Sequence, residues 1–161
     1  MPSLKAATIA SAVIAIMVGL PAPGHAETTP AQSQAKWAKE KLHRVVIQVT
    51  QNDPAVMTLA LNNAENLAKY FQDKGEKIEI EFVAYGAGLM MFRDDTSPVK
   101  ERLTAMSKMK NITFSGCGNT LANQSKMESK SITLVAEAHV VQTGIARIVE
   151  LEEQGWTYVR P

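Results

Sequence analysis

Only one cysteine, Cys117, occurs in the 161 residues of this chain. A single cysteine has no partner within the chain, so an internal disulfide framework is excluded. A chain of this length buries a full core without needing a disulfide or a structural metal. The thiol is therefore either inert and buried or free and reactive, and its sequence context has to decide between the two.

The chain also lacks an excess of charge of either sign. It carries 17 basic and 16 acidic side chains, and the only charged side chain within residues 1–26 is Lys5. A nucleic-acid-binding domain would show a basic excess, and strong binding to anionic lipid would need clustered basic residues. Nucleic acid and the membrane surface are therefore disfavoured as partners.

Long hydrophobic runs are missing except at the start of the chain. Lys5 precedes an apolar stretch, Ala6–Leu20, and the small residues Gly24 and Ala26 stand at the positions that a signal peptidase reads. This run is shorter than the ~20 residues that a membrane-spanning helix needs. The pattern predicts a signal peptide over residues 1–26, cleaved after Ala26, and hence a periplasmic protein that is not attached to the membrane.

Residues 27–41 are polar and alanine-rich, which predicts a flexible leader, and residues 42–161 are predicted to form one domain. Strand-like and helix-like segments alternate through this domain. Apolar strands that alternate with helices indicate a mainly parallel sheet with helices on both faces. We therefore expect a three-layer, flavodoxin-like α/β domain with five strands. The expected strands are 44–50, 78–85, 112–114, 132–135 and 156–159, and the expected helices are 54–73, 98–110, 119–127 and 140–153.

Local signals set several of these boundaries. Asp53 is suited to cap a helix whose first residue is Pro54, and Gly75 is suited to end it. Apolar residues at helical spacing then predict which side chains face the core. In the first helix they are Val56, Leu59, Ala60, Ala64, Leu67 and Phe71, and in the last helix Ile145, Ile148, Val149 and Leu151.

Ligand sites in open parallel sheets lie outside the carboxyl ends of the strands. Three loops are expected to meet there, at residues 50–53, 85–88 and 115–119. Cys117 lies in the third loop, between two glycines and at the start of a predicted helix. Free N–H groups and the helix dipole stabilise a thiolate at such a position. This context favours a reactive cysteine, although a free cysteine is also often a small buried hydrophobic residue.

Other chemistries find less support in the sequence. Gly86-Ala-Gly88 lacks the third glycine of a dinucleotide-binding turn, and there is no phosphate-loop lysine motif. Neither a nucleotide nor a flavin is therefore expected, and no cofactor is predicted. Methionines and histidines suit copper, but Met106 and Met109 have the spacing of core residues, so no metal is predicted. His139 is retained as a candidate partner for the Cys117 thiol.

Four segments of the chain together form a recognisable pattern: Leu61-Asn-Asn-Ala-Glu-Asn66, Ala84-Tyr-Gly-Ala-Gly-Leu89, Phe114-Ser-Gly-Cys-Gly-Asn-Thr-Leu121 and Gly144–Pro161. In these segments the chain resembles the DsrE/DsrF-like sulfur-relay family, in particular its small single-domain branch. The resemblance implies a three-layer α/β fold, a homo-oligomer (trimer or hexamer), and a cysteine that carries sulfane sulfur as a persulfide. By motif match this cysteine is Cys117. The residues implied to line its pocket are Gly86, Gly88, Gly116, Gly118, Asn119, Thr120 and Gly144, with His139 added from its position in the sequence.

Three hypotheses of function follow. The first is a periplasmic sulfur carrier with sulfurtransferase-like activity, which takes sulfur from a donor onto Cys117 and passes it to an acceptor. The second is a non-catalytic oligomeric binding module, whose strand-end pocket holds a small anion or a partner protein while Cys117 only fills space. The third is a redox or metal sensor in which Cys117 forms a disulfide between subunits.

Overall fold

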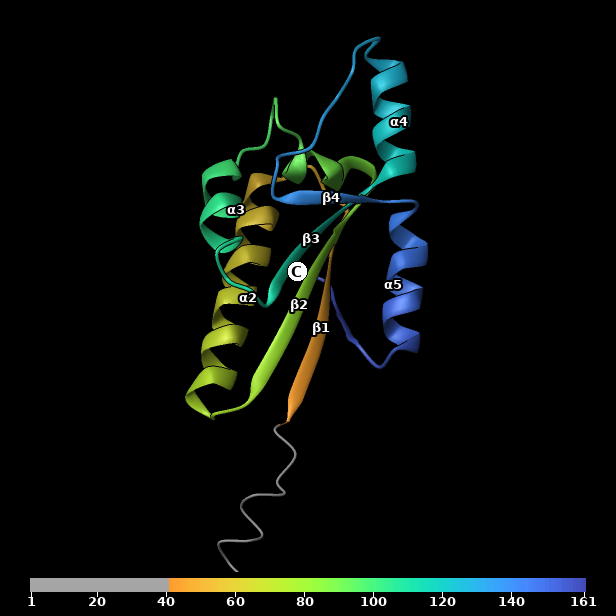
Figure 1. Cartoon of the computed structure of the whole chain (residues 1–161). Coiled ribbons are helices and arrows are strands. Elements are labelled where there is room, and N and C mark those ends of the chain that lie inside the picture. Colours follow the sequence, from red (N-terminus) through yellow and green to blue (C-terminus); the bar gives the residue numbers. More distant parts are fainter. Residues whose placement is uncertain (1–40) are drawn as a thin grey trace, which may run out of the picture. The chain divides into compact units, whose positions relative to one another are not determined.

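A computed structural model describes residues 41–161, in which strands and helices alternate (Figure 1). The predicted signal peptide and residues 27–40 of the predicted leader lie outside the described residues. The described elements, in chain order, are β1 (Leu42–Val49), α2 (Pro54–Asp73), β2 (Lys77–Ala84), the 3₁₀ helix η1 (Gly86–Phe92), α3 (Lys100–Met106), β3 (Ile112–Cys117), α4 (Gly118–Met127), β4 (Ala138–Val141), α5 (Gly144–Glu153) and β5 (Thr157–Val159).

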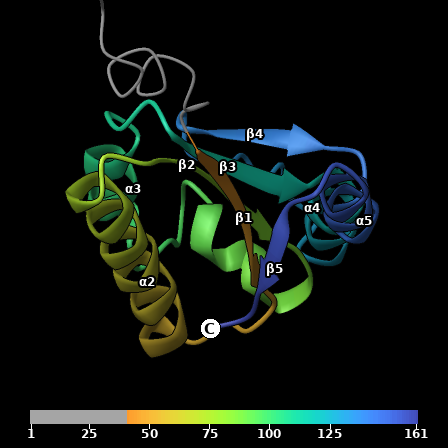
Figure 2. The same ribbon diagram turned by 90° about the horizontal axis from the view of Figure 1, so that it is seen from below.

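The five strands form one sheet in the order β4-β3-β2-β1-β5, and every neighbouring pair is parallel. Parallel neighbours need crossover connections, which the helices provide. The chain moves outward from β1 to β4 and then returns to the far side of β1, so α2 and α3 cover one face and α5 covers the other (Figures 1 and 2). The predicted three-layer α/β fold with a parallel sheet is confirmed.

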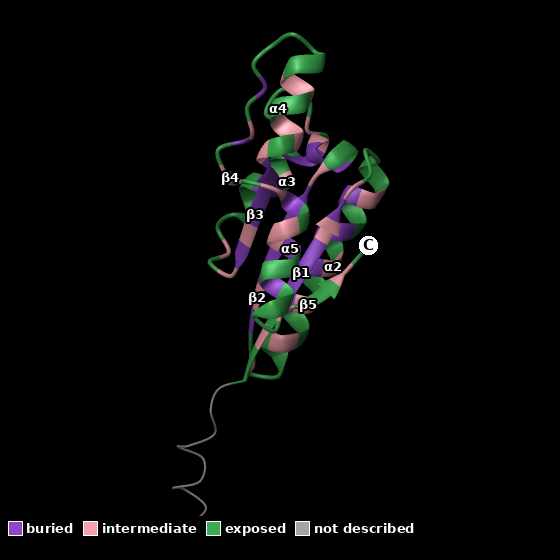
Figure 3. Cartoon of the chain, turned by 90° about the vertical axis from the view of Figure 1, so that its right-hand side faces the viewer, coloured by how far each residue is buried: buried purple, intermediate pink, exposed green. Residues whose placement is uncertain are grey.

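Alternation along the strands divides the core into two parts. Val45 and Ile47 of β1 pack in the larger cluster beneath α2 and α3, whereas Val46 belongs to a smaller cluster beneath α5. Figure 3 shows buried residues following the sheet. The smaller cluster contains Val46, Val83, Ile148 and Leu151, with Tyr85 and Trp156 at its margin.

Helix α2 begins and ends where the sequence predicts. The Asp53 carboxylate accepts a hydrogen bond from the Ala55 N–H at 2.8 Å, and Gly75 adopts a φ of +69° beyond the last turn. The predicted core face is wrong at Leu59, which is 47% exposed, while Met57 and Leu61 are fully buried. The helix is rotated by about one residue from the predicted face, so that Met57, Leu61 and Ala68 are buried together with Ala60 and Ala64.

The fourth strand is not where the sequence predicts. Residues 132–135 form only an isolated antiparallel bridge, between Leu134 and Arg93, and the fourth strand is Ala138–Val141. Helix α5 consequently begins at Gly144 rather than at Val140. Two of its predicted core residues, Ile145 and Val149, are exposed.

Two smaller differences lie between β2 and β3. The predicted glycine turn after β2 continues as η1, and α3 spans only Lys100–Met106, which is shorter than predicted. Among the described helices, none combines the length and the apolar character needed to cross a membrane.

Candidate functional site

The loops at the carboxyl ends of β1, β2 and β3 are in contact, as the sequence predicts. The Tyr85 N–H donates to the Val49 carbonyl at 3.2 Å. A Cβ atom at Gly88 would lie 2.2 Å from that same carbonyl oxygen, so only glycine fits at this approach. The Gly86 N–H donates to the Thr120 hydroxyl oxygen at 3.1 Å, which connects the end of β2 to α4.

Cys117 is both the last residue of β3 and the N-cap of α4. Its side chain is buried, with the residue 5% exposed. The sulfur accepts a hydrogen bond from the Thr120 N–H at 3.5 Å, and it also interacts with the Asn119 and Gly144 amides and the Thr120 side chain. The donors come from the first turns of two helices, α4 and α5, whose dipoles both favour negative charge here.

Two opposing effects set the pKa of the Cys117 thiol. Burial raises the pKa because it disfavours the charged form. Hydrogen bonds from the Thr120 side chain and from the Gly144, Thr120 and Asn119 amides outweigh burial and bring the net pKa below the ordinary thiol value. The site therefore favours a thiolate, or another anionic sulfur, at a largely buried position.

The predicted pocket glycines play different parts around this sulfur. A Cβ at Gly144 would lie 2.9 Å from Cδ1 of Tyr85, so glycine allows the start of α5 to pack on that ring and its N–H to reach the sulfur. Gly118 lies against Val140 and the Val141 carbonyl oxygen. Gly116 faces Leu134 and Leu89, on the opposite side of β3 from Cys117. Gly88 and Gly116 therefore allow close packing against β1 and against Leu134.

His139 lies in β4 in register with Ser115, two residues before the position opposite Cys117. Its Nε2 atom is 2.9 Å from the Ser115 hydroxyl oxygen, and that hydroxyl donates to the Glu81 carboxylate at 2.6 Å. The hydrogen-bond partner of His139 in the structure is therefore Ser115, whereas the sequence suggested Cys117. Ser115 is fully buried, which leaves it without access to a substrate.

Glu81 is a buried carboxylate that the sequence analysis did not single out. It is 2% exposed, and both of its oxygens accept hydrogen bonds from Arg147 of α5 at 2.8 Å. A two-point contact of this kind fixes the orientation of both groups. Because Arg147 is one turn beyond Gly144, the pair holds the start of α5, and with it the Gly144 amide, against the sheet.

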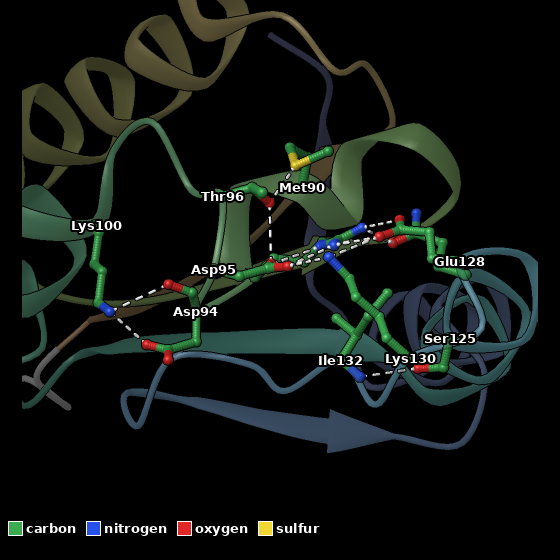
Figure 4. A network of polar contacts seen from close by, with 11 residues as sticks. Met90, Asp94, Asp95, Thr96, Lys100, Ser125, Glu128, Lys130 and Ile132 are labelled. Carbon is green, nitrogen blue, oxygen red and sulfur yellow. Dashed lines mark hydrogen bonds and ion pairs between the residues drawn. The ribbon is translucent and has the colours of Figure 1, made fainter.

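Arg93 is a second buried charged residue that the sequence analysis did not identify. It is 2% exposed and is one of four charged side chains joined by ion pairs, which we call the Arg93 cluster: Arg93, Asp95, Glu128 and Lys130. Figure 4 shows Asp95, Glu128 and Lys130 side by side. The partners of Arg93 are two to 35 residues away in sequence, so no local pattern marks this arginine as buried.

Within residues 41–161, no group of three or more histidine, cysteine, aspartate or glutamate side chains is placed to hold a metal ion. The chemistry that the described site offers is that of a single sulfur surrounded by hydrogen-bond donors.

No protein-family model and no curated protein matches the chain. Among solved structures, the chain is similar to the protein of unknown function MTH1491 from Methanobacterium thermoautotrophicum, with 30% sequence identity and a TM-score of 0.63. The similarity covers 74% of this chain and 99% of that protein. Identity at this level over nearly the whole length of the relative goes beyond a shared fold, and the chain belongs to the same family as MTH1491.

Proposed function

We propose that this protein is a periplasmic sulfur carrier that holds sulfane sulfur as a persulfide on Cys117. The observation that carries the proposal is the donor set around the sulfur, in which amides from two helix starts and the Thr120 side chain lower the pKa of a buried thiol. The same donors suit a persulfide anion, whose charge lies on the sulfur next to that of Cys117. The sequence resemblance to the DsrE/DsrF-like family supports the same reading.

The transfer step needs no cofactor. With thiosulfate as donor, the Cys117 thiolate attacks the outer sulfur, the sulfur–sulfur bond of thiosulfate breaks, and sulfite leaves with the bonding electron pair. The product is the Cys117 persulfide anion. An acceptor thiolate then attacks the outer sulfur of the persulfide, and the Cys117 thiolate is the leaving group, so the carrier returns to its starting state.

The proposal includes export and assembly. Cleavage of the predicted signal peptide after Ala26 would place the domain in the periplasm, and the resemblance suggests a homo-oligomer, either a trimer or a hexamer. The sulfur donor and acceptor would then be periplasmic small molecules or proteins. The mass of the protein purified from the periplasm tests the export, because a chain that begins at Glu27 is expected.

The test of sulfur transfer is the intact mass of the protein, purified without reductant and incubated with thiosulfate or polysulfide. We expect the wild-type protein to gain the mass of one sulfur atom and to lose it on treatment with dithiothreitol. Cys117→Ser is expected to gain nothing. A wild-type mass that stays unchanged with every donor would refute the carrier function.

One observation favours a second candidate, the non-catalytic binding module. Cys117 is 5% exposed, and a donor must reach its sulfur before any transfer occurs. If the thiol resists both sulfur donors and alkylating reagents in the folded protein, Cys117 is structural. The function would then lie in binding a small anion or a partner protein.

A further inference from the structure

Helix α4 is attached to the rest of the domain in an unusual way. None of its residues is buried, and the helix extends past the sheet with only exposed and intermediate residues along it (Figures 1 and 3). A surface helix is normally held by an apolar stripe that faces the core. The position of α4 must therefore depend on polar contacts.

The first group of contacts is centred on Gly86. Its N–H donates to the Thr120 hydroxyl oxygen, and its carbonyl accepts a hydrogen bond from Gln124, each at 3.1 Å. Thr120 and Gln124 are one helical turn apart, so they lie on the same side of α4. Thr120 also interacts with the Cys117 sulfur, and the contact with Gly86 therefore orients one donor of the site.

The second group is the Arg93 cluster at the other end of α4. Arg93 Nη2 donates to Glu128 at 2.9 Å and to Asp95 at 2.8 Å, and Arg93 Nη1 approaches Gln124 at 3.4 Å. Lys130 bridges Asp95 and Glu128 on the outer side, at 2.9 and 3.1 Å. The cluster joins the residues at the end of α4 to the segment that follows η1.

From these contacts we propose that Arg93 is a positioning residue for the Cys117 site, because its contacts with Glu128 and Gln124 hold α4, and with it Thr120, in place beside the thiol. This inference rests on the proposed function, which makes Cys117 the functional residue of the site. When the Arg93–Glu128 contact breaks, α4 moves away from Gly86, the Thr120 side chain loses its fixed orientation at the sulfur, and reagents reach Cys117.

The exposures of the partners indicate that α4 opens without unfolding of the domain. The Arg93 side chain is 2% exposed, whereas Glu128 is 38% exposed and Asp95 39%. A buried arginine that loses one carboxylate still keeps the other, so the open state does not leave an unpaired buried charge. Segments that open locally while the rest of the domain stays folded are the least stable parts of a fold.

The test is the rate of alkylation of Cys117 by iodoacetamide, measured from acidic to alkaline pH. Such a profile separates two quantities, the pKa of the thiol and the rate constant of the fully ionised thiolate. We would compare the wild-type protein with Arg93→Met, which keeps an apolar stem in the buried site, and with Glu128→Ala, which removes one exposed partner. Arg102→Met is the matched control, because Arg102 forms an ion pair with Glu65 between α3 and α2 at 3.0 Å.

We expect both cluster variants to raise the pKa of the thiol and to increase the rate constant of the thiolate about tenfold, the change that corresponds to about 1.4 kcal/mol in the opening equilibrium. Hydrogen exchange should quicken in α4 and stay slow in β2 and β3, which also shows that the variants are folded. Arg102→Met should behave as the wild type.

Profiles for Glu128→Ala and Arg93→Met that coincide with the wild type would overturn the proposal. An equal effect from Arg102→Met would overturn it too, because general destabilisation would then explain the result. Alkylation needs no sulfur donor, so this outcome is separate from that of the proposed function. Opening controlled by Arg93 in a protein that forms no persulfide would leave the role of Arg93 intact and refute only the sulfur carrier.

Discussion

At Cys117 the position of one sulfur atom matters more than its burial. Burial by itself would make the thiol a poor nucleophile, since it raises the pKa. The sequence around the thiol reverses this effect, because Cys117 caps α4 while Gly144 opens α5 beside it. A cysteine elsewhere in this core would have burial without these donors.

Gly144→Ala tests the contribution of the second helix. Its Cβ would lie 2.9 to 3.2 Å from three atoms of Tyr85, so the first turn of α5 has to shift and its amide leaves the sulfur. We expect the pKa of the Cys117 thiol to rise, because one of the donors that lower it is lost, as measured by the ultraviolet absorbance of the thiolate during a pH titration.

Gly75→Ala provides the control for this variant. Gly75 has a φ of +69° and follows α2 at the opposite end of the strands, so alanine strains the backbone there without touching the site. Its stability should fall while the thiol pKa stays at the wild-type value. A wild-type pKa in Gly144→Ala would show that the α5 amide contributes nothing.

At the scale of elements, the clearest signals in the sequence are local ones. Helix α2 is predicted to the residue because Asp53, Pro54 and Gly75 act within the same turn as the boundaries they set. The prediction of the fourth strand is wrong because Ile132–Val135 is the more apolar segment, while the true strand contains the exposed residues His139 and Val140. An edge strand needs little hydrophobicity, since only one side of it is paired and buried.

The residues of the candidate site also differ in whether a local sequence signal identifies them. Cys117, Asn119 and Thr120 are close in sequence, and a strand–turn–helix pattern was enough to bring them together. Gly144 came only from the family resemblance. Arg93 carried no signal, since it stands in a run of ordinary composition and meets Glu128 only through the tertiary fold. Long-range ion pairs of this kind are the part of the site that a single sequence does not disclose.

The Arg93 cluster gives α4 a defined response to acid. Hydrogen bonds from Arg93 and Lys130 lower the pKa of Glu128 to about 2. The pKa of Asp95 is lowered as well, mainly by the hydrogen bonds from Arg93 and to a smaller extent by the one from Lys130. An unfolded glutamate titrates near ~4.3. The ionised Glu128 therefore stabilises the folded state fully above that value, and this stabilisation is lost as the pH falls toward 2.

Comparison of the wild-type protein with Glu128→Gln tests this response. We expect the wild type to have the larger free energy of unfolding in urea at neutral pH, and the difference between the two proteins to shrink as the pH falls below 4. Glu153→Gln, at an exposed position of α5, is the control for the loss of a carboxylate outside the Arg93 cluster. A Glu128→Gln difference that stays constant from pH 7 to pH 3 contradicts the assignment.

For the whole molecule, the two faces of the sheet are covered unequally. The face under α2, α3 and η1 holds most of the core, and the other is covered by α5 and only a small cluster. Ile145 and Val149 are four residues apart, so they form an apolar stripe along the outer side of α5, and they are 53% and 48% exposed. This stripe is the surface through which we expect the proposed homo-oligomer to form.

Val149→Glu places a charge in that stripe. We expect it to lower the sedimentation coefficient to that of a single chain, because burying an unpaired carboxylate in an interface costs more than the contact gains. Leu59→Glu is the matched control, since Leu59 is 47% exposed on α2, across the sheet, and should leave the assembly unchanged. Dissociation by Leu59→Glu alone would move the interface to the α2 face. If the wild-type protein sediments as a single chain at every concentration, there is no homo-oligomer, and each Cys117 site is complete within one chain.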